Sequence, residues 1–234
     1  MSTRTLSVIA LTTLLGACAS PPPSAPLSAQ SLQHHHWVLE KIDGLPLHVL
    51  DTAGLRESPD EERFTVVFFG GEPLSNRKLI EYMVDYCEKR FREAGKFVEF
   101  VMTTNATLLT EDTVDYLNAH RFGLSVSIDG PKTVHDRNRI TVGGQGTYDV
   151  VRRKAEMLLS RYNSRPVGAR VTLTTGVTDV ETIWDHLFNE LGFAEVGFAP
   201  VTSGDLSDFN LSSEELVQVF ANMKALGRRY LEAA

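Results

Sequence analysis

Cysteine is scarce in this sequence: among 234 residues only Cys18 and Cys87 occur. Two cysteines cannot form a disulfide framework or a metal site with several thiolate ligands. Positive charge is also in deficit, because 23 Lys and Arg stand against 30 Asp and Glu and the net charge is −7. Nucleic-acid binding generally needs a basic face. The balance therefore argues against nucleic acid and suits a soluble protein that acts on a small molecule or a peptide.

The N-terminal apolar run is too short to span a membrane as a helix. Arg4 precedes an apolar run from Leu6 to Leu15, and the run ends in Leu15-Gly16-Ala17-Cys18. This order of charge, apolar run and small residues is typical of a secretory signal. Its end resembles a bacterial lipoprotein box, in which cleavage leaves Cys18 as the lipid-bearing first residue. We expect residues 1–20 to be such a signal segment, with a chance apolar N-terminus as the alternative.

Residues 21–63 contain no regular hydrophobic period. The segment 21–36 is rich in Pro, Ser and Ala and is expected to be a disordered linker; its histidines 34–36 fit a solvated run better than a metal site. Residues 37–63 look composite. Residues 37–44 resemble the opening strand of META-type envelope lipoproteins, and residues 47–58 are similar to the Asp-Thr-Ala-Gly segment of tRNA-modifying GTPases.

A GTPase also needs a glycine-rich phosphate loop that carries Gly-Lys-Ser/Thr, and an Asn/Thr-Lys-x-Asp guanine reader. Neither motif occurs in this sequence, so no residues are present that would bind a nucleotide near Asp51. GTP hydrolysis is therefore the least favoured function.

Strand-like and helix-like segments alternate regularly from Phe64 onward. The predicted strands are 64–69, 98–103, 123–128, 169–174 and 196–200, and the predicted helices are 75–94, 110–120, 147–163, 179–191 and one from Ser212 toward Tyr230. This alternation predicts right-handed βαβ units and a parallel sheet. The expected fold is α/β, an open, partial β/α barrel of about five parallel strands over 64–234. The expected core consists of Val66, Phe68, Phe100, Val126, Ile128, Val171, Leu173 and Phe198.

The strand from Val66 to Phe69 runs into Gly70-Gly71-Glu72-Pro73. Glycine lets backbone groups approach a ligand closely, and proline can open the next helix. Ligands of α/β folds bind at the C-terminal ends of the strands. The residues expected to converge at that edge are Glu72, Asn105, Ser127, Asp129 and Pro200.

Four pieces of sequence belong together: residues 68–74, residues 103–110, residues 127–131 with 135–139, and residues 166–174 with 197–201. They resemble the radical S-adenosylmethionine (SAM) superfamily, and within it the peptide-modifying maturases that serve sulfatases and quinohemoprotein amine dehydrogenase, with Ala106 in place of a family glycine. The pieces span about 170 residues in the family's order. By this resemblance the chain lacks the family's first strand and cluster loop, and Leu47–Leu50 is a candidate substitute for the strand.

The resemblance implies a cofactor site for SAM. Gly70, Gly71, Glu72 and Pro73 would hold the amino group of SAM, and Asn105 lies in the family's Thr-Asn-Gly-Thr-Leu-Leu segment. Ser127 and Arg139 would meet the ribose and carboxylate end, and Val196 would lie against the adenine. A hydroxyl suits a ribose and a guanidinium suits a carboxylate. The resemblance implies a peptide or protein substrate and indicates no catalytic acid or base.

One departure from the family is severe. Its chemistry needs a 4Fe–4S cluster, which three closely spaced cysteines hold as thiolates. No such triad exists among these residues. We expect no cluster or other metal on this chain and no activity as it stands; the alternatives are a non-enzymatic envelope lipoprotein or a composite chain. A SAM-cleaving core belongs in the cytoplasm, whereas the N-terminus would direct export, with membrane attachment only through a lipid on Cys18.

Overall fold

The computed structural model describes residues 8–12, 41–42, 45–46, 62–201 and 207–233. The linker over 21–36, the histidine run, the GTPase-like segment with Asp51, the candidate strand Leu47–Leu50 and the candidate lipidation site Cys18 lie outside these residues. Among the described residues, none of the helices combines the length and the apolar character that a membrane span requires.

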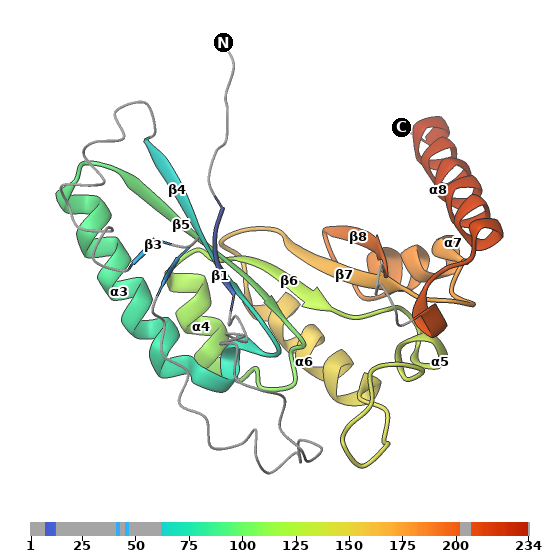
Figure 1. Ribbon diagram of the computed structural model, residues 1–234, viewed down its shortest axis with the longest axis horizontal. Helices are drawn as coiled ribbons and strands as arrows, with labels where there is room; N and C mark the ends of the chain where they lie inside the picture. The colour runs from blue at the N-terminus through green and yellow to red at the C-terminus, as the bar shows by residue number, and fades with distance from the viewer. Residues whose placement is uncertain (1–7, 13–40, 43–44, 47–61, 202–206, 234) are drawn as a thin grey trace, which may run out of the picture. The chain divides into compact units, whose positions relative to one another are not determined.

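The main sheet contains six strands in the order β1-β4-β5-β6-β7-β8 (Figure 1). Their bounds are β1 Val8–Thr12, β4 Arg63–Phe69, β5 Phe97–Thr104, β6 Gly123–Ser127, β7 Val167–Leu173 and β8 Glu195–Pro200. The pairs β1–β4, β6–β7 and β7–β8 are parallel. A separate antiparallel pair joins β2, Lys41–Ile42, to β3, Leu45–Pro46. The predicted α/β fold with parallel strands is confirmed.

The edge strand β1 comes from the N-terminal apolar run. Its residues pair in parallel with β4, from Val8 opposite Thr65 to Thr12 opposite Phe69. A signal segment was expected here, and the candidate substitute for the missing first strand was Leu47–Leu50 instead. A short run of β-branched and aliphatic residues satisfies either role, and here it completes the ladder of β4.

The helices follow the predicted alternation closely. Their bounds are η2 Pro73–Asn76, α3 Arg77–Glu93, α4 Glu111–Ala119, α5 Lys132–His135, α6 Tyr148–Arg161, α7 Val180–Trp184, a π-helix η3 Asp185–Glu190, η4 Ser207–Phe209 and α8 Ser213–Ala233. Thr110 caps α4 as expected, since its side chain accepts a hydrogen bond from the Thr113 N–H. The short α5 and the π-helical turn that continues α7 were not predicted.

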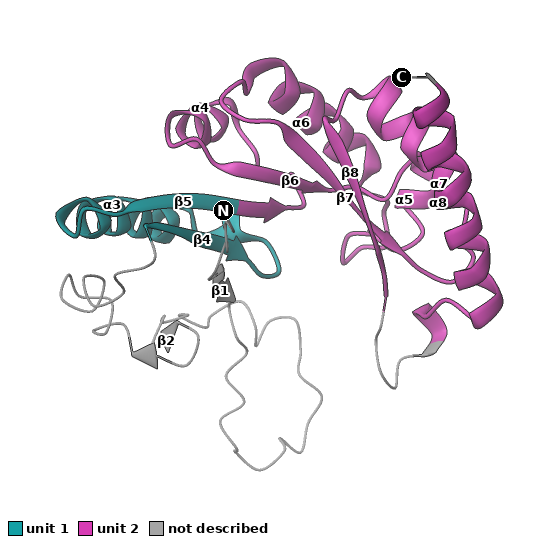
Figure 2. Ribbon diagram, turned by 90° about the horizontal axis from the view of Figure 1, so that it is seen from above, with its two compact units in different colours: residues 1–101 teal, residues 102–234 magenta. Residues whose placement is uncertain are grey.

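The chain divides into two compact units, residues 1–101 and residues 102–234 (Figure 2). In the first unit, β4 packs on α3, where the ring centroids of Phe64 and Phe91 lie 5.0 Å apart. Phe68 of β4 also contacts Phe100 of β5, with ring centroids 6.2 Å apart. In the second unit the core gathers residues from β6, β7 and the helices α4 and α6, among them Val126, Val171, Leu117 and Leu158.

The predicted core is buried in every member except Phe198, which is only partly covered. Phe198 lies on β8, the last strand of the sheet, which within the described part of the chain pairs only with β7. A strand at the end of a sheet buries less of each side chain than a central strand does.

Candidate functional site

The sheet of the second unit has two different faces. Along β6, Leu124 and Val126 are buried, whereas Ser125 and Ser127 are only partly covered. Successive side chains of a strand point to opposite faces, so the serines share the open face. On β7 the same alternation buries Val171 and leaves Arg170 exposed.

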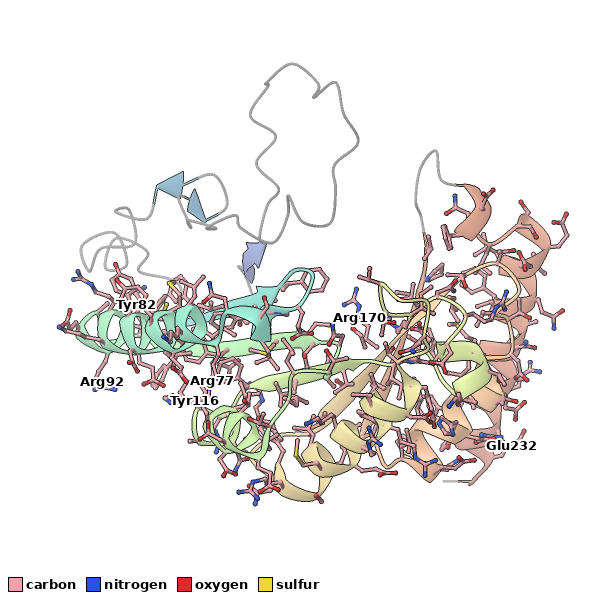
Figure 3. All side chains as sticks on the ribbon, turned by 90° about the horizontal axis from the view of Figure 1, so that it is seen from below. Arg77, Tyr82, Arg92, Tyr116, Arg170 and Glu232 are labelled. Atoms are coloured by element: carbon pink, nitrogen blue, oxygen red, sulfur yellow. The ribbon has the colours of Figure 1, made fainter. Side chains whose placement is uncertain are left out.

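The register aligns these open positions across the strands. Ser127 is opposite Arg170, and Arg170 is opposite Gly197 of β8. Arg170, which Figure 3 labels on β7, therefore lies between two small neighbours. Thr172 follows on the same face, about 7 Å further along β7. The open face thus carries hydroxyls and a guanidinium, a surface suited to a polar ligand.

A buried ion pair lies where β6 ends. Asp129 is 5% exposed, and its carboxylate accepts two hydrogen bonds from Arg139, from Nε at 2.6 Å and from Nη2 at 2.9 Å. The Thr172 backbone N–H donates to Asp129 at 2.8 Å, and the Thr172 hydroxyl oxygen accepts a hydrogen bond from Arg139 Nη2 at 3.3 Å. This two-pronged geometry is the strongest arrangement of a guanidinium with a carboxylate.

His135 connects the two members of this pair. Its Nδ1 accepts a hydrogen bond from the Asp129 backbone N–H at 3.3 Å, so its ring proton lies on Nε2. Nε2 lies 3.0 Å from the Thr147 hydroxyl, which in turn donates to the Arg139 carbonyl at 2.8 Å. A continuous path of hydrogen bonds therefore joins the backbone of Asp129 to the backbone of Arg139.

Burial keeps His135 neutral. Its side chain is 0% exposed, and desolvation lowers its pKa to about 4, helped by the nearby Arg139 and opposed by Asp129 and Asp136. Tyr148 of α6 adds an edge-on ring contact at 5.8 Å. At neutral pH the imidazole is therefore uncharged, with Nδ1 as hydrogen-bond acceptor and Nε2–H as donor.

The residues between His135 and Arg139 fix the same corner to its surroundings. Asp136 accepts a hydrogen bond from the Tyr148 N–H at 2.8 Å. Arg137 donates to the carbonyls of Thr175 and Gly176, and Asn138 donates to the Thr174 hydroxyl at 2.9 Å. Each side chain of residues 135–139 therefore forms a hydrogen bond with a residue outside the segment, which holds this corner in place.

The other predicted residues of this unit have different surroundings. Asn105 shapes the turn after β5, since its Oδ1 accepts from the N–H and the hydroxyl of Thr107. Ala106, which replaces a family glycine, has a φ of 64° and is fully buried. Val196 is opposite Ala169, a buried position, and so lies on the face away from Ser127. Ser127 and Arg139 are the predicted residues that share the open face and its edge.

The glycine loop, residues 70–73, belongs to the first unit. Gly70 has a φ of 145°, a conformation that favours glycine. Pro73 opens η2 as predicted, and Glu72 caps it by accepting a hydrogen bond from the Leu74 N–H at 3.1 Å. The loop therefore combines a backbone that only glycine adopts readily with a carboxylate at a helix start.

Sequence reasoning missed His135, Thr147, Arg170 and Thr172 as parts of the site. The alternation of small or polar residues with apolar ones along β6 and β7 was a signal that could have placed Arg170 and Thr172 beside Ser127. No comparable signal marked His135 or Thr147, because both lie in irregular or short segments. Among the described residues, no cluster of three His, Cys, Asp or Glu side chains could hold a metal ion.

Comparison with known proteins identifies the family of this chain. The chain is 33% identical over 91 residues to the Cysteine-type anaerobic sulfatase-maturating enzyme of Clostridium perfringens. This match covers 38% of this chain and 24% of the enzyme. It is also 48% identical over 44 residues to the tRNA modification GTPase MnmE of Marinobacter nauticus, 19% of this chain and 10% of that protein. The chain thus spans well under half the length of these curated relatives.

The solved structure of native anSMEcpe with bound AdoMet and Cp18Cys peptide shares the fold. The TM-score is 0.66 at 20% identity, over 86% of this chain and 56% of the other. The Radical SAM superfamily itself matches residues 54–188, which is more than half of the sequence. On these grounds the protein belongs to the Radical SAM superfamily.

Proposed function

We propose that this chain is the SAM-binding core of a peptide-modifying radical SAM protein, and that it does not assemble a 4Fe–4S cluster from its own residues. The observation that carries the first part is the open face of the second unit, where Ser127 and Arg139 adjoin the C-terminal ends of parallel strands. Polar groups at this edge are the usual ligand-binding groups of α/β folds.

Arg139 retains capacity for a ligand. Its Nε and Nη2 engage Asp129 and Thr172, and its side chain remains 26% exposed. The bonds to Asp129 fix the plane of the guanidinium, so the Nη1 donors are held in a defined direction. A carboxylate that approaches Nη1 would meet an oriented charge, and the Ser127 hydroxyl would suit the ribose of the same ligand.

The residues do not fit the cluster of the superfamily. That cluster, which supplies the electron for SAM cleavage, needs three closely spaced thiolates, and the chain contains two cysteines far apart. Cys87 is buried in α3, and burial, with a smaller effect of Glu88, raises its pKa to about 12. A thiol with that pKa is a poor thiolate ligand. The cysteines of this chain therefore do not supply the ligands that SAM cleavage would need.

The peptide substrate is proposed from kinship. The sulfatase-maturating relative is named for action on a protein, and the solved neighbour was determined with a peptide bound. We place this core in the cytoplasm, where a SAM-dependent radical enzyme operates.

Isothermal titration with SAM tests the first part of the proposal. Saturable one-site binding is expected for the full chain. Ser127→Ala and Arg139→Gln should each weaken it about tenfold, the loss of one good hydrogen bond or more. Arg228→Gln, which removes an exposed arginine of α8, is the matched control and should bind as the parent does. Equal affinity of all four proteins would refute the assignment of the site.

Anaerobic reconstitution with iron and sulfide tests the second part. We expect no 4Fe–4S absorption and less than one iron per chain after desalting. A stable product with about four irons per chain would refute it, since four irons are the content of one such cluster.

A further inference from the structure

We infer that His135 is a positioning residue that sets the arrangement of Asp129 and Arg139 for the ligand, an inference that rests on the proposed SAM site. His135 faces the backbone of Asp129 on one side and, through the Thr147 hydroxyl, the backbone of Arg139 on the other. It lies behind the ion pair and bonds to neither of its charged groups.

The first step concerns orientation. Asp129 and Arg139 lie ten positions apart in the sequence, at opposite ends of a segment that contains Gly130, with a φ of 126°, and the short helix α5. Such a segment has many conformations available when it is unconstrained. The path through His135 and Thr147 fastens both ends, so the carboxylate and the guanidinium meet in one geometry before a ligand arrives.

The second step concerns the chemical form of the imidazole. The Nδ1 acceptor is paired with a backbone N–H, which cannot accept in return, so Nδ1 must be unprotonated. The Nε2–H then donates to Thr147, whose own proton is directed to the Arg139 carbonyl. Every donor in the path has one acceptor, and reversal of any bond would leave a buried group unpaired, which costs about 1–3 kcal/mol.

The third step separates positioning from bulk packing. His186 is a second buried histidine of the same unit, with its Nε2 2.7 Å from the Tyr148 hydroxyl and its Nδ1 2.7 Å from Glu190. Its ring centroid also lies 5.8 Å from that of Tyr148, and its hydrogen bonds go to Tyr148 and Glu190 rather than to Asp129 or Arg139. His186 is therefore a matched control for the loss of a buried, hydrogen-bonded imidazole.

The experiment measures the SAM dissociation constant of the full chain by isothermal titration, with circular dichroism to verify folding. His135→Ala should raise the constant at least tenfold. Thr147→Val, which leaves His135 bonded to Asp129, should raise it about three- to fivefold, and Thr147→Ser should restore the parent value. His186→Asn should leave the constant within twofold of the parent although it lowers the melting temperature.

A spectroscopic signature accompanies the titration. The Arg139 Nε–H resonance should be slow to exchange in the parent because of its 2.6 Å bond to Asp129. It should exchange faster in His135→Ala and Thr147→Val and return in Thr147→Ser. If His135→Ala fails to fold, the Thr147 pair still decides the matter.

The possible failures are distinct. Absence of SAM binding by the parent chain would refute the proposed function itself. Binding by the parent that neither the His135 nor the Thr147 variants weaken would refute the positioning role alone, and so would an equal loss in His186→Asn.

Discussion

A buried neutral histidine makes the second unit sensitive to acid. The pKa of His135 is about 4 when folded, against about 6.5 for an exposed histidine, so the unfolded chain binds more protons between these values. Stability is therefore complete above pH 6.5 and falls as the pH drops toward 4. We expect a loss of about 2–3 kcal/mol from this residue between pH 7 and pH 4.5, because each unit of pKa difference is worth about 1.4 kcal/mol.

Urea denaturation at pH 7.0 and pH 4.5 measures this loss. The control is His135→Asn, in which the amide oxygen can take the place of Nδ1 and no titration occurs. The variant should be less stable than the parent at pH 7 and should show a clearly smaller difference between the two pH values. An identical pH dependence in both proteins would contradict the prediction.

The buried thiol of Cys87 should be inert. Its pKa of about 12 leaves a negligible thiolate fraction at pH 8, and its side chain is only 3% exposed. In a Cys18→Ser background, iodoacetamide at pH 8 should alkylate the native protein at least about a hundredfold more slowly than the protein in urea, because the thiolate is the nucleophile. Mass spectrometry follows the reaction, and comparable rates would show that Cys87 is accessible.

The positions of single residues were predictable where those residues lie at the C-terminal end of a predicted strand. Ser127 and Asp129 lie where the alternation of strands and helices put them, because the C-terminal ends of parallel strands share an edge. Val196 shows the limit: its strand was predicted, but its face depends on the register with β7, which places it beside Ala169. A shift of one residue reverses the face of every side chain, and sequence alone does not fix the register.

At the scale of elements, α8 depends on a small cluster of side chains near its C-terminal end. The Tyr230 hydroxyl accepts a hydrogen bond from the Trp184 indole at 2.6 Å, and its ring contacts Trp184 at 5.4 Å and Phe188 at 6.0 Å. Arg229 adds bonds to Glu181 and Asp185. These contacts join α8 to α7 and to the π-helix that continues it.

Tyr230→Ala should lower the free energy of unfolding by about 1–2 kcal/mol, since it removes one hydrogen bond and two aromatic contacts. Leu231→Ala is the matched control: Leu231 is the next residue of the helix, is 81% exposed, and should change stability by less than about 0.5 kcal/mol. Urea denaturation compares the two, and hydrogen exchange should show faster opening of α8 in the first variant only. Equal effects would mean that the cluster does not hold α8.

The regular elements were predictable because their periodicity extends over many residues. Helix α3 and strand β6 appear almost as expected. Helix α5 was not, since its four residues are too few to show a period. The π-helical turn over 185–190 was missed for another reason: its apolar spacing resembles that of the α-helix it extends, and only the bond pattern distinguishes them.

At the scale of the whole molecule, the signal role expected for the N-terminal residues is incompatible with their place in the sheet. If residues 1–17 were removed as a signal, β1 would be lost together with them. The pairing of Val8–Thr12 with Thr65–Phe69 would then be absent, and that side of β4 would present unpaired N–H and C=O groups. An exposed edge of apolar residues favours association between chains. The same segment therefore cannot both direct export and complete the sheet.

A comparison of the full chain with a form that begins at Cys18 decides between these roles. If β1 completes the sheet, the amides of Thr65–Phe69 should exchange with solvent at least about tenfold faster in the shortened form, because ladder bonds protect amides from local opening. The amides of β7, which is paired on both sides, are the internal control and should be unchanged. Light scattering should also show larger particles for the shortened form. Equal protection of β4 in both forms would mean that β1 adds nothing to the sheet, and the expectation of a cleaved lipoprotein signal would gain support.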